Sequence, residues 1–199
     1  MSQIGTSDLR QVPDGPFTRR EALALGVSRW TLGHWYESGV IERLTRGLYQ
    51  KVDSAPVDVD LVEAVKRAPD ATLCLVSALA QHGLVDEIPQ AIDLAIRNGQ
   101  RPPATTGPIT WHRFDSDTFD VGRGVIPIEG TDLHVGLYSA ERSIVDAFRL
   151  RRLVGYEVAA EALRAWLRRP GATPAGILAV ADQLPRAQAP LRAALEYLA

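Results

Sequence analysis

The segment 18–51 constrains the fold more than any other part of this 199-residue chain, because the starts and ends of two short helices can be read in it. Thr18 is an N-cap residue, and Glu21 follows it at the spacing of a capping box, so a helix is expected to begin here. Gly26 ends that helix. Ser28 then caps a second helix after a short turn, which is the spacing of a helix-turn-helix.

A hairpin follows the second helix, which is expected to end at Gly39. Strands are predicted over 40–44 and 48–51, and Gly47 between them supplies the positive φ of a tight turn. Two short helices followed at once by a basic hairpin are the layout of a winged helix-turn-helix. The segment therefore predicts a domain that places one helix in a DNA groove.

The second helix of such a domain meets base edges, whereas the first helix and the wing neutralise phosphates. With Leu32 as the core-facing origin at 100° per residue, Trp35 and Tyr36 fall on the core side. Trp30 lies on the opposite side, where it either faces DNA or packs against residues 4–12. The candidate DNA-binding residues are Arg19, Arg20, Ser28, Arg29, Trp30, Thr31, Gly33, His34, Arg43, Arg46 and Lys51.

The rest of the chain alternates between helical and strand patterns, as a mixed α/β domain does. A helix is expected after Pro56, then a short buried strand over 71–76, and then a helix capped by Ser77 and ended by Gly83. Strands are predicted over 91–97, 109–114, 124–130 and 133–138, and helices over 139–150, 158–168, 173–184 and 189–198. The predicted fold class is α+β, with a winged helix-turn-helix over 1–52 and a mixed α/β C-terminal domain with terminal helices over 53–199.

Charge and hydropathy narrow the class of protein. The net charge is −2, yet residues 1–51 carry seven Arg or Lys against five Asp or Glu, and residues 52–90 carry two against seven. The acidic stretch indicates a connecting region that turns away from phosphate. The sequence has no apolar run of the roughly 18 residues that span a membrane, and its N-terminus lacks the order of a signal peptide. We therefore expect a cytoplasmic protein that has no membrane partner.

Neither a metal nor another cofactor is expected. The single cysteine, Cys74, lies in the apolar run TLCLV and is interpreted as a buried small side chain. A disulfide or a zinc site cannot be built from one cysteine. The histidines show no spacing that suits a metal ligand set, because each falls in a different element. They are His34, His82, His112 and His134.

The polar residues Glu141, Arg142 and Asp146 invite a catalytic interpretation, but they share the start of one helix. A structural network is favoured there, with Glu141 interacting well with the helix dipole. A nuclease would need two acids and a lysine that converge on a strand, and the only lysines are Lys51 and Lys66, in the wing and in an early helix. The chain is therefore predicted not to be an enzyme.

The sequence resembles the AbiEi family, the antitoxins of AbiE-type (type IV) toxin–antitoxin systems and related bacterial regulators. The resemblance covers about residues 16–150 and is carried by short motifs. These are Phe17-Thr18, Gly26-Val27-Ser28-Arg29, Leu32, Gly39, Arg43-Leu44, Arg46-Gly47-Leu48-Tyr49, the segment LVSALAQHGL over 75–84, and the segment YSAERSIVD over 138–146. The family pattern usually has more polar or basic residues at Trp30, Gly33 and Trp35, so base preference is the property that this chain would change.

The resemblance implies an antitoxin that binds inverted repeats in its own promoter, represses its operon and opposes a nucleotidyltransferase toxin, without necessarily forming a stable complex with it. Two copies would then bind, as a dimer or cooperatively as monomers. The alternative is a stand-alone winged-helix regulator without a toxin partner. A third possibility is that the winged helix is a protein-interaction module, which salt-dependent DNA binding would exclude.

Overall fold

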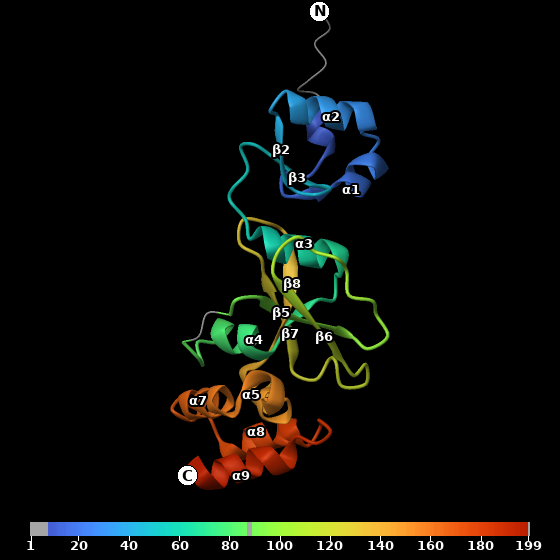
Figure 1. Ribbon diagram of the computed structural model, residues 1–199. Helices are drawn as coiled ribbons and strands as arrows, with labels where there is room; N and C mark the ends of the chain where they lie inside the picture. Colours follow the sequence, from blue (N-terminus) through green and yellow to red (C-terminus); the bar gives the residue numbers. More distant parts are fainter. Residues whose placement is uncertain (1–7, 87–88, 199) are drawn as a thin grey trace, which may run out of the picture. The chain divides into compact units, whose positions relative to one another are not determined.

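The computed structural model describes residues 8–86 and 89–198, and its fold is mixed α+β, as predicted (Figure 1). The chain forms two compact units, each built from separate stretches of sequence. The first comprises the described residues up to Pro69, with Pro103–Gly107 and Pro127–His134; the second comprises the described residues of Asp70–Pro102, Pro108–Ile126 and Val135–Ala199. The division into domains 1–52 and 53–199 stays a prediction about which parts fold independently.

The first unit contains a winged helix-turn-helix. Its elements are the 3-10 helix Asp8–Gln11, β1 Phe17–Thr18, α1 Arg19–Ala24, α2 Arg29–Glu37, β2 Ile41–Thr45 and β3 Leu48–Lys51. The capping box is formed: the Thr18 hydroxyl accepts a hydrogen bond from the Glu21 N–H at 3.2 Å, and the Glu21 carboxylate accepts one from the Thr18 N–H at 2.6 Å. Both predicted helices and both wing strands are present, with bounds that differ by a residue or two.

The wing is a three-stranded antiparallel sheet rather than a two-stranded hairpin, with strand order β1-β3-β2. The sequence pattern missed β1, because a strand of two residues has no periodicity. Pairing of Thr18 with Leu48 ties the start of α1 to the wing, and the Arg19 N–H donates to the Gly47 carbonyl at 2.9 Å. The first helix of the motif and the wing turn are therefore held together.

The hydrophobic core of this module lies beneath α2. Leu32 and Trp35 are buried, as predicted, and they pack with residues from every neighbouring element. The buried cluster comprises Val12, Phe17, Ala22, Val27, Leu32, Trp35 and Ile41. The prediction for Tyr36 was wrong: its side chain is half-exposed, because it lies about 100° around the helix from the buried Trp35, at the edge of a narrow apolar stripe.

One further helix, α3 (Val59–Arg67), belongs to the first unit. It is the helix expected after Pro56, and the Asp58 side chain caps it by accepting from the Leu61 N–H at 3.0 Å. Its carboxylate residue Glu63 is buried although it is charged. A buried carboxylate must be hydrogen-bonded, and the partners of Glu63 fix the position of the helix.

The second unit is built on a mixed five-stranded sheet with strand order β6-β5-β4-β8-β7. β4 pairs antiparallel with β5 and parallel with β8, while β5 and β6 are parallel. The strands are β4 Thr72–Leu73, β5 Ile92–Arg97, β6 Ile109–Phe114, β7 Arg123–Pro127 and β8 His134–Tyr138. All of them were predicted from the sequence.

The expected strand over 71–76 is shorter than predicted, because helix α4 (Leu75–Gln81) already begins at Leu75. Cys74 is its N-cap and makes no side-chain capping hydrogen bond. Ser77, the expected cap, instead accepts a hydrogen bond from the Asp93 N–H of β5 at 2.8 Å. A run of apolar residues cannot by itself show where a buried strand becomes a buried helix.

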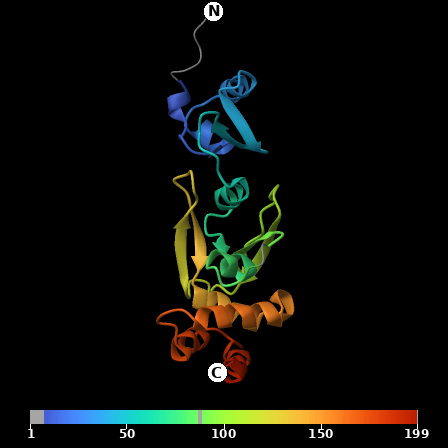
Figure 2. The ribbon, with the colours of Figure 1, turned by 90° about the vertical axis from the view of Figure 1, so that its left-hand side faces the viewer.

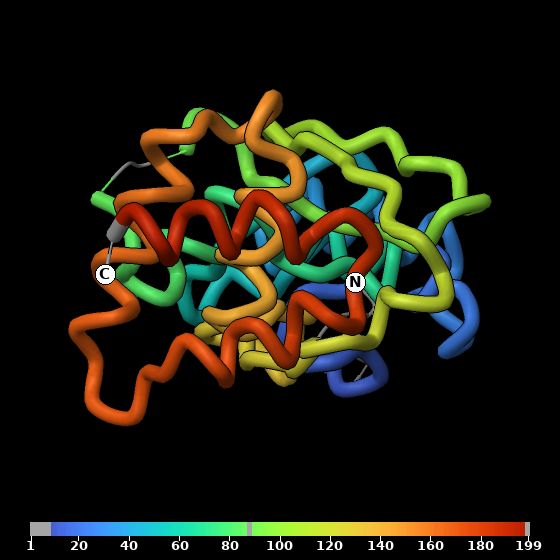
Figure 3. Tube along the Cα trace, turned by 90° about the horizontal axis from the view of Figure 1, so that it is seen from below, coloured from blue at the N-terminus to red at the C-terminus, as the bar shows by residue number. Residues whose placement is uncertain are grey.

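Helices from the C-terminal part of the chain gather at one end of this sheet (Figures 1 and 2). They are α5 Ala140–Arg149, α6 Arg151–Val154, α7 Tyr156–Leu167, α8 Pro174–Ala181 and α9 Gln188–Leu198. The α8 and α9 helices lie side by side (Figure 3). α5 is buried along most of its length and packs against α4, α7, α8 and α9. The short α6 was not predicted.

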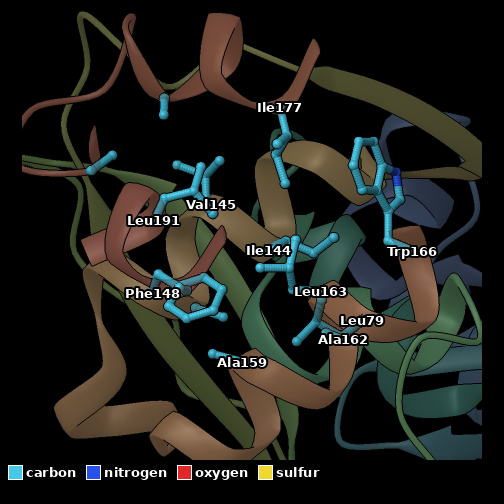
Figure 4. Close-up of a cluster of buried hydrophobic side chains, with 14 of the residues drawn as sticks. Leu79, Ile144, Val145, Phe148, Ala159, Ala162, Leu163, Trp166, Ile177 and Leu191 are labelled. Atoms are coloured by element: carbon cyan, nitrogen blue, oxygen red, sulfur yellow. The ribbon is translucent and has the colours of Figure 1, made fainter. Parts of the chain in front are cut away.

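The core of the helical layer is aliphatic and aromatic, and Figure 4 shows Ile144, Val145 and Phe148 of α5 facing Leu163 of α7 and Leu191 of α9. Burial of such side chains contributes about 1.5–3 kcal/mol each relative to exposure.

None of the helices formed by residues 8–86 and 89–198 is long and apolar enough to cross a membrane.

A buried ion network joins α5 to the connection between β6 and β7. Arg142 and Asp146 are both fully buried, and the Arg142 Nε donates to Asp146 at 2.7 Å. Arg142 also donates to the carbonyls of Thr118 and Val121 at 2.8 and 2.7 Å, and Arg149 reaches the second oxygen of Asp146 at 2.7 Å. The predicted structural network is therefore present for Arg142 and Asp146, whereas Glu141 accepts a hydrogen bond from the Trp166 indole at 3.2 Å. The buried Arg142 Nη2 has no hydrogen-bond partner among the described residues.

Replacing Arg142 by alanine is expected to destabilise the protein by about 3–5 kcal/mol, because Asp146 loses one buried partner and two carbonyls lose their donor. Urea unfolding followed by circular dichroism measures the change. The exposed Arg152, replaced by alanine, is the matched control and should stay within about 0.5 kcal/mol of the wild type. Equal unfolding midpoints for the two variants would contradict a stabilising role for the network.

Candidate nucleic-acid interface

The N-terminal end of α2 is fixed by two hydroxyl groups. The Ser28 hydroxyl accepts a hydrogen bond from the Thr31 N–H at 2.9 Å, and the two side-chain oxygens lie 2.8 Å apart. Ser28 and Thr31 were both predicted to contact DNA. In the structure their side chains cap the start of α2, where Arg29 is the first helical residue. Arg29 is exposed.

A shallow hollow of about 230 Å³ lies beside α2, between this helix and the wing. Three of the predicted arginines line it, and they come from three elements: Arg19 from α1, Arg29 from α2 and Arg43 from β2. Residues more than twenty positions apart in the sequence thus converge on one groove. Its other lining residues are Leu32, Gly33, Tyr36 and Tyr49.

Two tyrosines in this groove were missed by the sequence analysis. Tyr36 lies at the rim and is half-exposed, and Tyr49 is half-buried and stacks on Phe17 with ring centroids 6.2 Å apart. The signal for Tyr36 was available, because at 100° per residue it lies within 60° of Arg29 and Gly33. Tyr36 was nevertheless assigned to the core side, because its ring is largely apolar.

The outer face of α2 carries an aromatic pair. Trp30 is 65% exposed, and its ring stacks on that of His34 with centroids 5.4 Å apart and planes 4° apart. The alternative for Trp30 was packing against residues 4–12, of which 4–7 lie outside the described residues. In the described part, Leu9 and Val12 pack with the core cluster around Trp35, and Trp30 is not a member of that cluster.

Gly33 lies in the middle of α2 and has an ordinary helical backbone. Glycine there costs about 1 kcal/mol relative to alanine. A Cβ atom at this position would meet no described residue within 4 Å, so packing inside the protein does not require glycine. The smooth helix surface at Gly33 opens onto the groove between Arg29 and Arg43.

A second hollow, of about 410 Å³, adjoins the first at Arg19. The predicted residues Arg20 and Arg46 line it together with Arg19. All three are exposed, and none is in an ion pair with another described residue. Five of the predicted arginines are therefore distributed over two adjoining hollows.

Residues 9–50 match the family model described as "Transcriptional regulator, AbiEi antitoxin". The match runs from the 3-10 helix to the penultimate residue of β3 and includes the whole of α2. It also includes every residue that lines the first hollow and the lining residues of the second hollow that come from α1 and the wing. Residues 9–50 are therefore similar to the AbiEi regulators and are called the AbiEi module below. No curated protein matches the chain.

One predicted DNA-binding residue, which lies just after the matched segment, is set apart from the others. Lys51, at the end of β3, is only 18% exposed, and its ammonium lies 2.6 Å from the Asp14 carboxylate. Its hydrogen bond lowers the pKa of Asp14. Lys51 lines neither hollow with the arginines and is already paired with an acid.

The carboxylate of Glu21 ties the AbiEi module to α3. It accepts from the Thr18 backbone and hydroxyl and forms an ion pair with Lys66 at 2.8 Å. Burial raises the pKa of Glu21, but the hydrogen bonds from Lys66 and Thr18 outweigh it, so the pKa is held below its ordinary value.

As for metal binding, residues 8–86 and 89–198 contain no group of three or more His, Cys, Asp or Glu placed to hold an ion.

The depressed pKa of Glu21 predicts a pH-dependent contribution to stability. A group whose pKa is lower in the folded state stabilises the fold above its unfolded pKa of about 4.3, and this contribution disappears as pH falls through the folded pKa. Glu21→Gln should therefore be less stable than wild type by about 0.5–1 kcal/mol at neutral pH, a modest value because Glu21 is 39% exposed. Thermal unfolding from pH 7 to pH 3 should show the gap closing, and a constant gap would contradict this role.

Proposed function

We propose that this protein is a DNA-binding antitoxin of an AbiE-like, type IV toxin–antitoxin system that represses its own operon. One observation carries the proposal: three arginines from α1, α2 and β2 converge on the groove beside the recognition helix, inside the segment that matches the AbiEi regulator family. Such an operon repressor acts on DNA in the cytoplasm.

The roles of the side chains follow from their places. Arg19, Arg43 and Arg46 stand on elements that flank α2, and each neutralises a backbone phosphate without reading sequence. Arg29 and the Trp30–His34 pair project from α2 itself. They meet base edges in the major groove.

Gly33 fits the same proposal. Because no protein neighbour fills the space at its Cβ, the helix surface there is free for a close approach of DNA. This accounts for the roughly 1 kcal/mol that a mid-helix glycine costs relative to alanine. Arg20 adds a phosphate contact beside Arg46, whereas Lys51 contributes through its ion pair with Asp14 by supporting the wing.

The operator is expected to be an inverted repeat, which two copies occupy either as a dimer or cooperatively as monomers. A titration of the protein against one half-site and against the full repeat separates the two modes. A dimer binds the half-site and the full repeat with the same stoichiometry of two chains. Cooperative monomers place one chain on the half-site.

The DNA-binding prediction is tested by mobility shift on the protein's own upstream region over a salt series. Wild type should bind at about 50 mM salt and weaken steeply as salt rises. Arg46→Ala should weaken binding to all duplexes alike, whereas Arg29→Ala and His34→Ala should reduce the preference for the operator over random DNA. The exposed Arg164 of the second unit, replaced by alanine, is the control. Equal losses on operator and random DNA for all three variants would reject the assignment of α2 as recognition helix.

The antitoxin role is tested in cells that express a nucleotidyltransferase toxin from the neighbouring gene. The full-length chain with Arg29→Ala and Arg46→Ala should relieve repression of a promoter fusion and still restore growth, because the toxin is opposed by a separate part of the chain. If the wild-type protein repressed the promoter fusion but gave no protection from the toxin, the alternative of a stand-alone regulator would be favoured. A protein-interaction role for the winged helix predicts no salt-dependent DNA binding at all.

A further inference from the structure

The second hollow reaches beyond the AbiEi module. On one side it is lined by Arg19, Arg20 and Arg46, and on the other by side chains of α3, a helix outside the matched residues 9–50. The contributions from α3 are Glu63, Lys66 and Arg67. The uncharged lining residues are Thr18, Gly47, Leu48 and Pro103. Five of its lining residues are basic and one is acidic.

The only acid of this cleft is already used in the fold. Glu63 is 2% exposed, and its carboxylate accepts from Arg67 at 2.6 Å and from the Thr106 N–H at 2.7 Å. The Thr106 hydroxyl in turn lies 2.6 Å from that of Thr45 at the end of β2. Glu63 thus neutralises part of the charge of Arg67, and Glu21 pairs with Lys66. The other cations of the cleft have no acidic partner among the described residues, and they are Arg19, Arg20 and Arg46.

α3 is fixed to the wing rather than being a loose connection. The chain of contacts from Glu63 through Thr106 to Thr45 holds one point of the helix. The ion pair of Lys66 with Glu21 holds a second point, at the capping box of α1. Two separate attachments fix both the distance and the rotation of the helix, so its basic side chains are held beside the wing turn.

Arg67 is positioned to reach a ligand in this cleft. Its side chain is 38% exposed, and Glu63 engages one of its terminal nitrogens while the planar guanidinium offers further donors. Arg19 lines both hollows, so the basic residues of the two hollows belong to adjoining surfaces. An elongated polyanion can contact both hollows at once, whereas a small isolated anion cannot.

We propose that the cleft between the wing and α3 binds a backbone phosphate of the operator, with Arg67 donating to it and Arg46 of the wing adding charge. The inference rests on the proposed DNA-binding function and extends its surface by one helix. The DNA-binding surface then comprises residues 9–50 together with α3, which is held in place by the loop 103–107. The contact is with phosphate, so it carries affinity and leaves base preference unchanged.

The test measures operator and random-DNA affinity by fluorescence anisotropy over a salt series, using the full-length chain. Arg67→Gln should bind both duplexes about fivefold to twentyfold more weakly at moderate salt. The slope of log affinity against log salt should fall by about 0.9, the value of one released phosphate contact. Arg67→Lys should recover most of the slope because it keeps the charge, and Arg164→Gln is the remote control.

A second variant keeps the test decisive if Arg67→Gln destabilises α3. Pro103→Glu adds a carboxylate to the rim of the cleft and removes no backbone N–H donor, since proline has none. It should weaken binding to both duplexes while the thermal unfolding midpoint stays within the range of the control. Wild-type affinity and salt slope in both Pro103→Glu and Arg67→Gln would overturn the cleft alone. Failure of the wild-type protein to bind DNA would overturn the proposed function as well.

Discussion

The carboxylate of Glu21 is the contact on which the DNA-facing half of this protein depends. It closes the capping box with Thr18 and therefore determines where α1 begins and where Arg19 and Arg20 stand. The same group holds Lys66 of α3. One side chain thus satisfies the orphan N–H of a helix start and also fixes a neighbouring helix.

The sequence predicted the elements of the winged helix well, because their ends are marked by local chemistry. Caps at Thr18 and Ser28 and positive-φ glycines at Gly26, Gly39 and Gly47 act within a few residues, so they can be recognised without knowledge of the fold. The buried strand-to-helix transition at Leu75 has no such marker, and the helix cap was predicted at Ser77, three residues after the observed cap Cys74. Elements of two or four residues, such as β1 and α6, are too short to show periodicity.

The candidate site was predicted only in part, and the features that were not predicted share one cause. Arg19, Arg29 and Arg43 could be proposed from their elements, but their convergence on one groove depends on packing between elements far apart in sequence. The strongly acidic composition of residues 52–90 suggested a segment turned away from phosphate. Its two basic residues, Lys66 and Arg67, nevertheless line the cleft beside the wing, while the acidic Glu63 is buried. Charge summed along a segment says little about which charges reach a given surface.

The way in which the chain builds its two units has a consequence for the life of the protein in the cell. The loop 103–107, which supports α3, lies in the sequence between β5 and β6 of the second unit, and residues 127–134 return to the first unit between β7 and β8. A protease that cuts the chain after α3 would release a winged helix without the Thr106 contact to Glu63. Loss of the segments that follow α3 would therefore also remove a contact that holds α3 in the first unit.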